Sequence, residues 1–246
     1  MCLFSGPVRE VYGTKIFGRI EGGNQYLVYQ MTFSAESDVA MVLPMPVVPG
    51  SAEDAVRFIN LESYKRFFRD LDKLFPERMD LEFMAPLSDG PVAAQVVLEV
   101  HEVGAFEASF VPTIPDFARL DPRFRLPDQV WGELGGYDDF GFAVFKLTAG
   151  NTQHAHPMAF SFPTRDEKKI FFPTVHVHDG KVHLEAQFDH KLYCQTDTPL
   201  KWEESNELSS DNVELEKAQG IFVANEKCYR QTLRGIGKNA DVYRDA

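Results

Sequence analysis

Alternation of apolar and polar residues along most of the chain predicts short β-strands. Residues 14–20 and 25–34 alternate on either side of Glu21-Gly22-Gly23-Asn24, whose composition is typical of a turn. Val39–Val48 is strongly apolar but contains Pro44 and Pro46, so its later part is expected at a sheet edge or in an extended loop. Further strands are predicted within 56–61, 92–111, 139–148, 158–162 and 170–194.

A helical period replaces this alternation in one stretch. Apolar side chains recur at intervals of three and four from Tyr64 to Phe75, charged residues take the other face, and Pro76 ends the pattern. The spacing predicts one amphipathic helix near 62–75, with its aromatic stripe in the core. Short helices are also predicted over 126–134, where Gly135-Gly136 would end the helix, and around 225–233.

The order of these elements indicates a fold class. Regular helices do not separate the strands, so a doubly wound parallel sheet is excluded in favour of an α+β fold, mostly antiparallel β, with one clear helix. We expect a β-rich domain over 1–194, a polar connection over 195–212, and a C-terminal segment, 213–246, that packs on the same domain.

The composition of the chain limits the classes of binding partner that it can have. The formal net charge of −12 argues against nucleic acid and against an anionic membrane surface, both of which select basic proteins. Three cysteines form no disulfide framework, and we find neither a signal peptide nor an apolar run long enough to span a bilayer. We therefore expect a soluble, cytoplasmic protein whose partner is a small molecule or another protein.

The strongest chemical pattern surrounds Asp179-Gly180, a pair that favours the turn of a β-hairpin. If these two residues form the loop, His176 lies directly opposite His183. Alternation then places His176, His178, His183 and Glu185 on one face. His190 and Cys194 would lie on the opposite face of a regular second strand.

Convergent imidazoles are ligands for a transition-metal ion such as zinc. The pattern predicts a metal site formed by His176, His178 and His183, to which His154 or His156 could contribute, with Glu185 as a ligand or a base. The alternative is a solvated sheet face, where these residue types are equally acceptable.

A second candidate site lies at the start of the chain. Removal of Met1 would make Cys2 the N-terminal residue, whose own α-amino group could act as a base. Met1-Cys2, together with Phe17-Gly18-Arg19, resembles the choloylglycine hydrolase family, in which a Phe-Gly-Arg segment supplies a site arginine. The resemblance implies an amide hydrolase with Cys2 as nucleophile and Arg19 as its charge partner. Here Ile20-Glu21-Gly22 follows, where that family has Asn-x-Asp.

A third resemblance covers residues 26–75. The apolar run Val39-Ala-Met-Val-Leu-Pro-Met-Pro-Val47 and the aromatic helical stretch after it are similar to a bacterial family of uncharacterised proteins. Members of that family have a cysteine near the mature N-terminus and an apolar strand that ends in Pro-x-Pro. This resemblance implies a bacterial source and a β-rich domain, but no reaction. Three classes of function remain open: a metal site, an amide hydrolase, and a binding or scaffold protein without catalysis.

Overall fold

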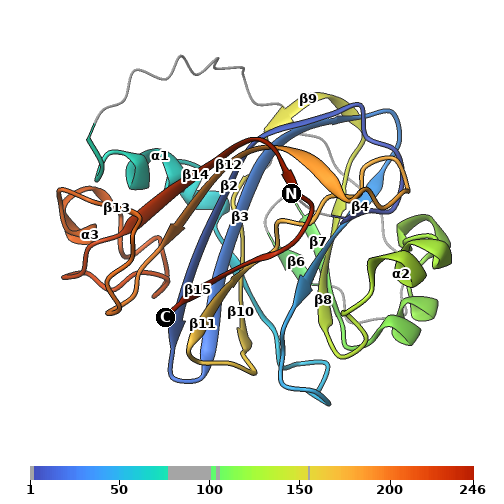
Figure 1. The fold of residues 1–246 in the computed structure, drawn as a ribbon, viewed down its shortest axis with the longest axis horizontal. Helices are drawn as coiled ribbons and strands as arrows, with labels where there is room; N and C mark the ends of the chain where they lie inside the picture. Colours follow the sequence, from blue (N-terminus) through green and yellow to red (C-terminus); the bar gives the residue numbers. More distant parts are fainter. Residues whose placement is uncertain (1–2, 77–100, 104–105, 155) are drawn as a thin grey trace.

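The computed structural model describes residues 3–76, 101–103, 106–154 and 156–246, and gives no side-chain account of 151–154. Far more of these residues lie in strands than in helices (Figure 1). Within the described ranges, the larger sheet has eight strands. In chain order they are β2 (Glu10–Glu21), β3 (Asn24–Ala35), β5 (Arg57–Asn60), β9 (Gly150–His154), β10 (Met158–Pro163), β12 (Glu185–Cys194), β13 (Glu203–Glu204) and β14 (Tyr229–Lys238).

The order across this sheet is β13-β14-β12-β2-β3-β10-β5, and β9 also pairs with β3. The β12–β2 pair is parallel, whereas the other described pairs of this sheet are antiparallel. Described residues also form a five-stranded sheet, ordered β1-β4-β8-β7-β6, and a separate β11–β15 pair. Their bounds are β1 (Leu3–Phe4), β4 (Val39–Met45), β6 (His101–Val103), β7 (Phe106–Val111), β8 (Gly141–Leu147), β11 (Lys169–Phe172) and β15 (Val242–Asp245).

The main core lies between the two large sheets. One cluster of buried apolar residues includes Leu27 and Phe160 from the larger sheet and Leu43 and Phe145 from the smaller one. The rings of Phe145 and Phe160 lie 5.9 Å apart between their centroids, so aromatic contact joins the sheets directly. Burial of apolar surface between two sheet faces is the main stabilising contribution in such a sandwich.

Helical segments cover the outer faces. The α-helices are α1 (Phe67–Asp72), α2 (Asp128–Leu134) and α3 (Ser209–Asn212), and the 3₁₀ turns are η1 (Glu62–Tyr64), η2 (Ile114–Arg119) and η3 (Pro122–Phe124). On one side of the larger sheet, α1 packs with residues that precede β14. The side chains of α2 pack on the smaller sheet.

The structure agrees with the predicted β-rich α+β class and refines its helices. The 62–75 stretch contains η1 and the six-residue α1, and its apolar positions from Tyr64 to Phe75 are buried. The short helix predicted over 126–134 is present as α2, and Gly135 follows it with φ of 50°. The helix predicted around 225–233 is wrong, because β14 begins at Tyr229 and pairs along the whole length of β12.

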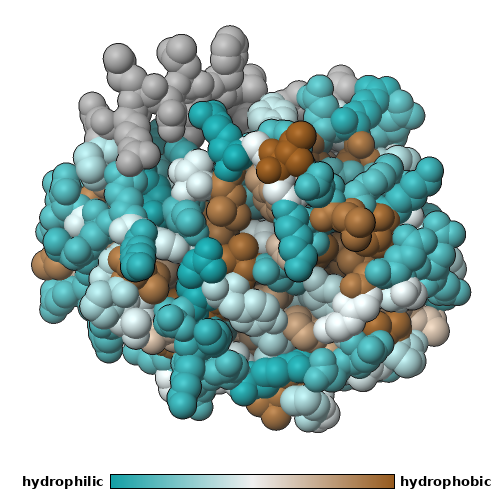
Figure 2. Space-filling view, in the orientation of Figure 1, coloured by the Kyte–Doolittle hydropathy of each residue, from teal (hydrophilic) through white to brown (hydrophobic). Residues whose placement is uncertain are grey.

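Two features concern the environment that the sequence predicts for this protein: the polarity of its surface and the lengths of its helices. On the face in Figure 2, hydrophilic side chains predominate and hydrophobic ones form separate small patches. Across the described ranges, no helix is both long enough and apolar enough to span a membrane.

Candidate functional site

The segment from Thr174 to His178 is held mainly by side chains from the C-terminal part of the chain. Oδ1 of Asp241 accepts the backbone N–H groups of Thr174 and Val175 at 2.8 and 2.9 Å. Oδ1 of Asn239 accepts the N–H of His176 at 2.7 Å, and its Nδ2 donates to the carbonyl of His176 at 2.9 Å. These bonds replace the ladder of a strand and fix the backbone that carries the histidines.

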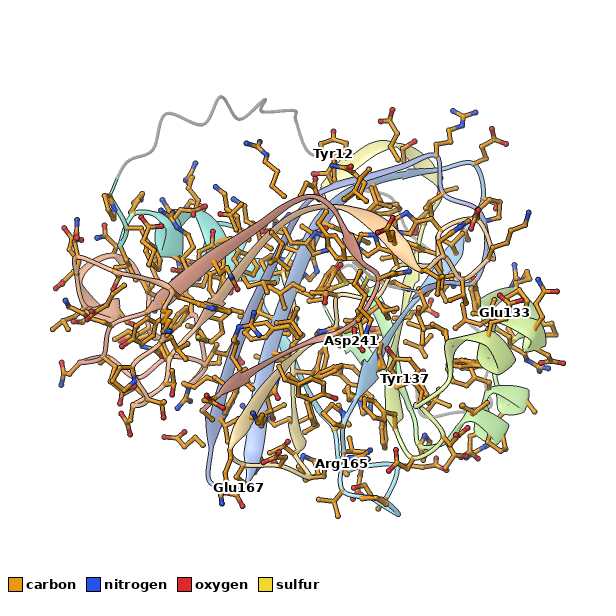
Figure 3. The ribbon with its side chains drawn as sticks, in the orientation of Figure 1. Tyr12, Glu133, Tyr137, Arg165, Glu167 and Asp241 are labelled. Atoms are coloured by element: carbon orange, nitrogen blue, oxygen red, sulfur yellow. The ribbon has the colours of Figure 1, made fainter. Side chains whose placement is uncertain are left out.

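Tyr137 contributes to holding the 174–178 segment through its contact with Asp241. The hydroxyl of Tyr137 donates to Oδ2 of Asp241 at 2.6 Å, and Figure 3 shows the two side chains next to each other in the centre of the molecule. Burial raises the pKa of Asp241, whereas the three donors stabilise its charged form. The carboxyl group therefore depends on these donors, which come from two different segments.

Three imidazoles meet beside this support. The His176 ring lies between those of His178 and His190, with centroid distances of 5.3 and 5.1 Å and interplanar angles of 12° and 15°. Nε2 of His176 and Nε2 of His190 are 3.4 Å apart. Phe188 also contacts the cluster, with its ring centroid 4.6 Å from that of His176. His190 is fully buried and His176 nearly so.

The N-terminal strand covers part of the cluster. Leu3 in β1 pairs with Val177, the residue between two of the histidines, and the N–H of Phe4 donates to the carbonyl of Val177 at 3.1 Å. The ring of Phe4 contacts that of His178 edge-on, with centroids 5.6 Å apart. The described chain therefore begins beside the histidines.

Burial controls the charge of this cluster. It lowers the pKa of His178 to about 4 and that of His190 to about 3, and it also depresses the pKa of His176, to which the neighbouring His190 and His178 contribute. A buried imidazolium is poorly solvated, and a second one close by adds like-charge repulsion. All three rings are therefore neutral at neutral pH.

The predicted hairpin around Asp179-Gly180 is wrong. β12 begins at Glu185 and pairs with β14 and β2, while the described contact of the 173–178 segment with a strand is the bridge from Val177 to Leu3. His183 therefore does not oppose His176. It is exposed, and its Nε2 lies 3.0 Å from Oδ2 of Asp179.

The remaining residues of the predicted metal site lie apart. Glu185 is exposed and pairs in register with Lys238. The ring of His156 is buried against Phe106, with centroids 4.3 Å apart, and its Nδ1 contacts the carbonyl of Pro157 at 3.0 Å. The backbone of His154 pairs with Thr32 in the larger sheet. Among the residues described, no three His, Cys, Asp or Glu side chains are grouped as a metal site.

The predicted nucleophile Cys2 lies outside the described residues. Its predicted partner Arg19 is 3 % exposed, and its guanidinium binds elsewhere. Nε donates to the carbonyl of Ile221 and Nη2 to that of Gly220, both at 2.7 Å, and Nη2 also contacts Glu21 at 3.1 Å. These contacts give Arg19 a structural role in holding the 220–221 turn against β2. The other cysteines, Cys194 and Cys228, are buried, and burial raises the pKa of both thiols.

Sequence reasoning missed His190 as a neighbour of His176. Strand parity assigned it to the opposite face, on the assumption that residues 174–178 were the hairpin partner of β12. It also missed the role of Asn239 and Asp241, which are polar residues in an otherwise ordinary tail. The only indication in the sequence was that both are residue types whose side chains readily form hydrogen bonds with backbone groups.

Comparison with solved structures shows which known protein shares this fold. No family model and no curated protein matches this chain. Among solved structures, a mutated baculovirus P35 after caspase cleavage aligns with 96% of this chain and 98% of its own, at 14% identity and a TM-score of 0.50. Baculovirus P35 itself gives 0.49 at 13% identity over 99% of each chain, and the caspase-8/P35 complex gives 0.49 at 12% identity over 95% and 96%. The first of these likenesses shows a shared fold over nearly the whole chain.

Proposed function

We propose that this chain is a protein-binding protein whose partner is a cysteine protease of the caspase class. The supporting observation is the fold that it shares with a P35 whose structure was determined after caspase cleavage. The likeness extends over nearly the full length of both chains, so it includes the sandwich and the segments that cover it. The proposal falls in the binding class that the sequence leaves open.

The architecture suits this role. Two sheets with a continuous aromatic core form a rigid base, and long connections run over its surface. Rigid scaffolds that present loops are the usual solution for protein recognition. The net charge of −12 also keeps such a protein soluble at the concentrations that stoichiometric binding requires.

Inhibition and cleavage are measured together. Increasing amounts of the purified chain are added to active caspase-8, and the remaining activity is followed on a small peptide substrate. The intact mass of the chain is recorded in parallel. We expect activity to fall in proportion to the chain added, and the mass to show cleavage at one bond, which the fragment masses locate.

The unfolded chain is the matched control, because it has the same sequence without the fold. A heat-unfolded sample should be cut as an ordinary substrate and should leave caspase activity unchanged after it is consumed. Full caspase activity in the presence of a large excess of folded, uncut chain would contradict the proposal.

A further inference from the structure

Most of β14 lies at the border of the larger sheet, with no described strand beyond it. β13 pairs only with Tyr229 and Arg230, at the beginning of β14, whereas β12 pairs with β14 along its whole length. From Gln231 to Lys238, β14 (dark red in Figure 1) therefore pairs with a described strand on one side only. This open stretch is longer than a typical whole strand of about 5–6 residues.

The backbone groups that face the open edge belong to the even-numbered residues of this stretch. The N–H of Asn239 donates to the carbonyl of Leu184, in the register that continues the β12–β14 pairing. Antiparallel strands exchange hydrogen bonds at every second residue pair, so the odd-numbered residues of β14 bond to β12. The N–H of Ser205 donates to the carbonyl of Cys228 in the β13 register, which places even-numbered residues on the side away from β12. The residues of the open stretch that direct N–H and carbonyl groups outward are Thr232, Arg234, Ile236 and Lys238.

The side chains of these four residues are exposed, and two of them are cations. Ile236 is 75% exposed, and Arg234 and Lys238 flank it two positions away on the same face of the sheet. Asp189 and Glu185 lie opposite these cations in β12, but within the described ranges neither cation has an ion-pair partner. All charged residues of β14 are basic, in a chain whose net charge is −12. The open edge is therefore a local basic surface with an aliphatic residue at its centre.

This composition differs from that of an edge that only prevents association. Protected edges are kept short, or are interrupted by proline or by a bulge. The open stretch of β14 contains no proline, and it presents Ile236 between two cations. Gly235 has a φ of 94° but keeps its register with Phe188, so the pairing with β12 continues through it. Two copies of this chain that met along β14 would bring their arginines and lysines together, and like charges on neighbouring strands repel. The charges therefore favour an acidic partner over a second copy.

We propose that the open edge of β14, from Gln231 to Lys238, binds an extended acidic segment of another protein as an added strand. The outward N–H and carbonyl groups supply the hydrogen bonds of the new pair, and the side chains select the sequence. Carboxylates four positions apart in the segment lie opposite Arg234 and Lys238, and an apolar residue midway between them lies opposite Ile236. Binding at this edge does not require binding to a caspase.

The test uses the isotope-labelled full chain and a peptide with blocked ends, Thr-Thr-Glu-Thr-Val-Thr-Glu-Thr-Thr. Calorimetry measures the affinity, and NMR follows the hydrogen exchange of the backbone amides. We expect the peptide to slow exchange at the outward amides of Thr232, Arg234, Ile236 and Lys238, and to change exchange little at Leu233, which already bonds to β12. This alternation distinguishes an added strand from attraction between charges alone. The same peptide with Lys in place of both Glu residues should bind at least fivefold more weakly.

Charge reversal tests how the segment is recognised. Arg234→Glu combined with Lys238→Glu should weaken binding of the acidic peptide at least fivefold and should strengthen binding of the Lys peptide. Lys65→Glu combined with Arg69→Glu is the matched control, because it changes the net charge equally at exposed positions next to and within α1 and should leave both affinities unchanged.

Two results would overturn the proposal. One is unchanged exchange at the outward β14 amides of the wild-type chain at high concentrations of the acidic peptide. The other is a dimer in which two copies of the chain protect these amides without peptide. Both measurements use the wild-type chain, so a variant that fails to fold does not leave the edge undecided.

Discussion

The hydroxyl of Tyr137 and the Oδ2 of Asp241 are 2.6 Å apart, which joins the connection before β8 to the turn before β15. Through its other oxygen, Asp241 holds the backbone of Thr174 and Val175. Because the surroundings of this carboxyl group disfavour its charged form, each of its donors replaces a bond that water would supply in the unfolded chain. Two distant segments, one with Tyr137 and one with Thr174 and Val175, therefore meet at the side chain of Asp241, beside the histidine cluster.

Replacement of Tyr137 by Phe should destabilise the chain by about 1.5–3 kcal/mol, the range for a hydrogen bond to a charged group. The substitution keeps the ring and removes only the donor. Urea denaturation followed by tryptophan fluorescence measures the difference. Tyr243→Phe is the matched control, because that ring is 41% exposed and its loss of a hydroxyl should change stability by less than about 0.5 kcal/mol. Equal stability of the two variants would show that the Tyr137 bond contributes nothing.

A second, partly buried carboxylate, Asp72 at the end of α1, connects the helix to the larger sheet. It accepts the hydroxyl of Tyr193 at 2.6 Å and pairs with Lys15 at 3.0 Å and Arg230 at 3.3 Å. Burial raises its pKa, but Lys15 and Lys191, together with the bond from Tyr193, outweigh this and lower the pKa below its usual value. The carboxylate is therefore more stable in the folded chain than in the unfolded one.

Asp72→Asn should destabilise the chain by about 2 kcal/mol at neutral pH, since it leaves partly buried cations without their counter-charge, at less than the cost for a fully buried pair. Because the folded pKa is depressed, the advantage of the wild type is complete above the unfolded pKa of about 3.9 and declines as pH falls through the lower folded value. Denaturation at neutral pH and at pH near 3 measures both effects. Asp245→Asn removes an exposed pair with Lys169 and should cost less than about 1 kcal/mol.

Local patterns predicted much of the fold, because strands and short helices are determined largely by neighbours in the chain. The turn at Glu21-Gly22-Gly23-Asn24 and the helix after Leu126 are in their predicted places. The partner of a strand is not local information. β12 has the alternation that a hairpin requires, yet it pairs with β14 and β2, which lie far from it in the sequence. That one choice of partner moved His183 to the surface and brought His190 to His176.

Arg19 offers a test of the structural role found for it. Its guanidinium donates to two carbonyls of the 220–221 turn and lies over the ring of Tyr26, 4.8 Å from the centroid. Arg19→Lys keeps the charge but cannot reach both carbonyls from one planar group, so we expect a loss of about 2 kcal/mol. Hydrogen exchange should show faster exchange around residues 218–222. Arg9→Lys, at an exposed pair with Glu36, should leave both measurements unchanged.

The histidine cluster should make the fold sensitive to acid. The pKa of His178 is about 4 and that of His190 about 3 in the folded chain, against about 6.5 when unfolded. Since the unfolded chain binds more protons at every pH between these values, the free energy of unfolding must fall as pH decreases from about 6.5 toward 4. The direction is opposite to that of a histidine stabilised by a carboxylate, whose folded pKa is raised.

His178→Phe should remove part of this sensitivity, because the ring remains against Phe4 but no longer takes up a proton on unfolding. Between pH 7 and pH 5, we expect the wild type to lose about 1–2 kcal/mol more than the variant, from the difference between the folded and unfolded pKa. Urea denaturation at both pH values measures this difference. His183→Gln, which removes an exposed histidine, should preserve the wild-type loss. Identical losses in the wild type and His178→Phe would mean that His178 takes up no extra proton on unfolding in this range.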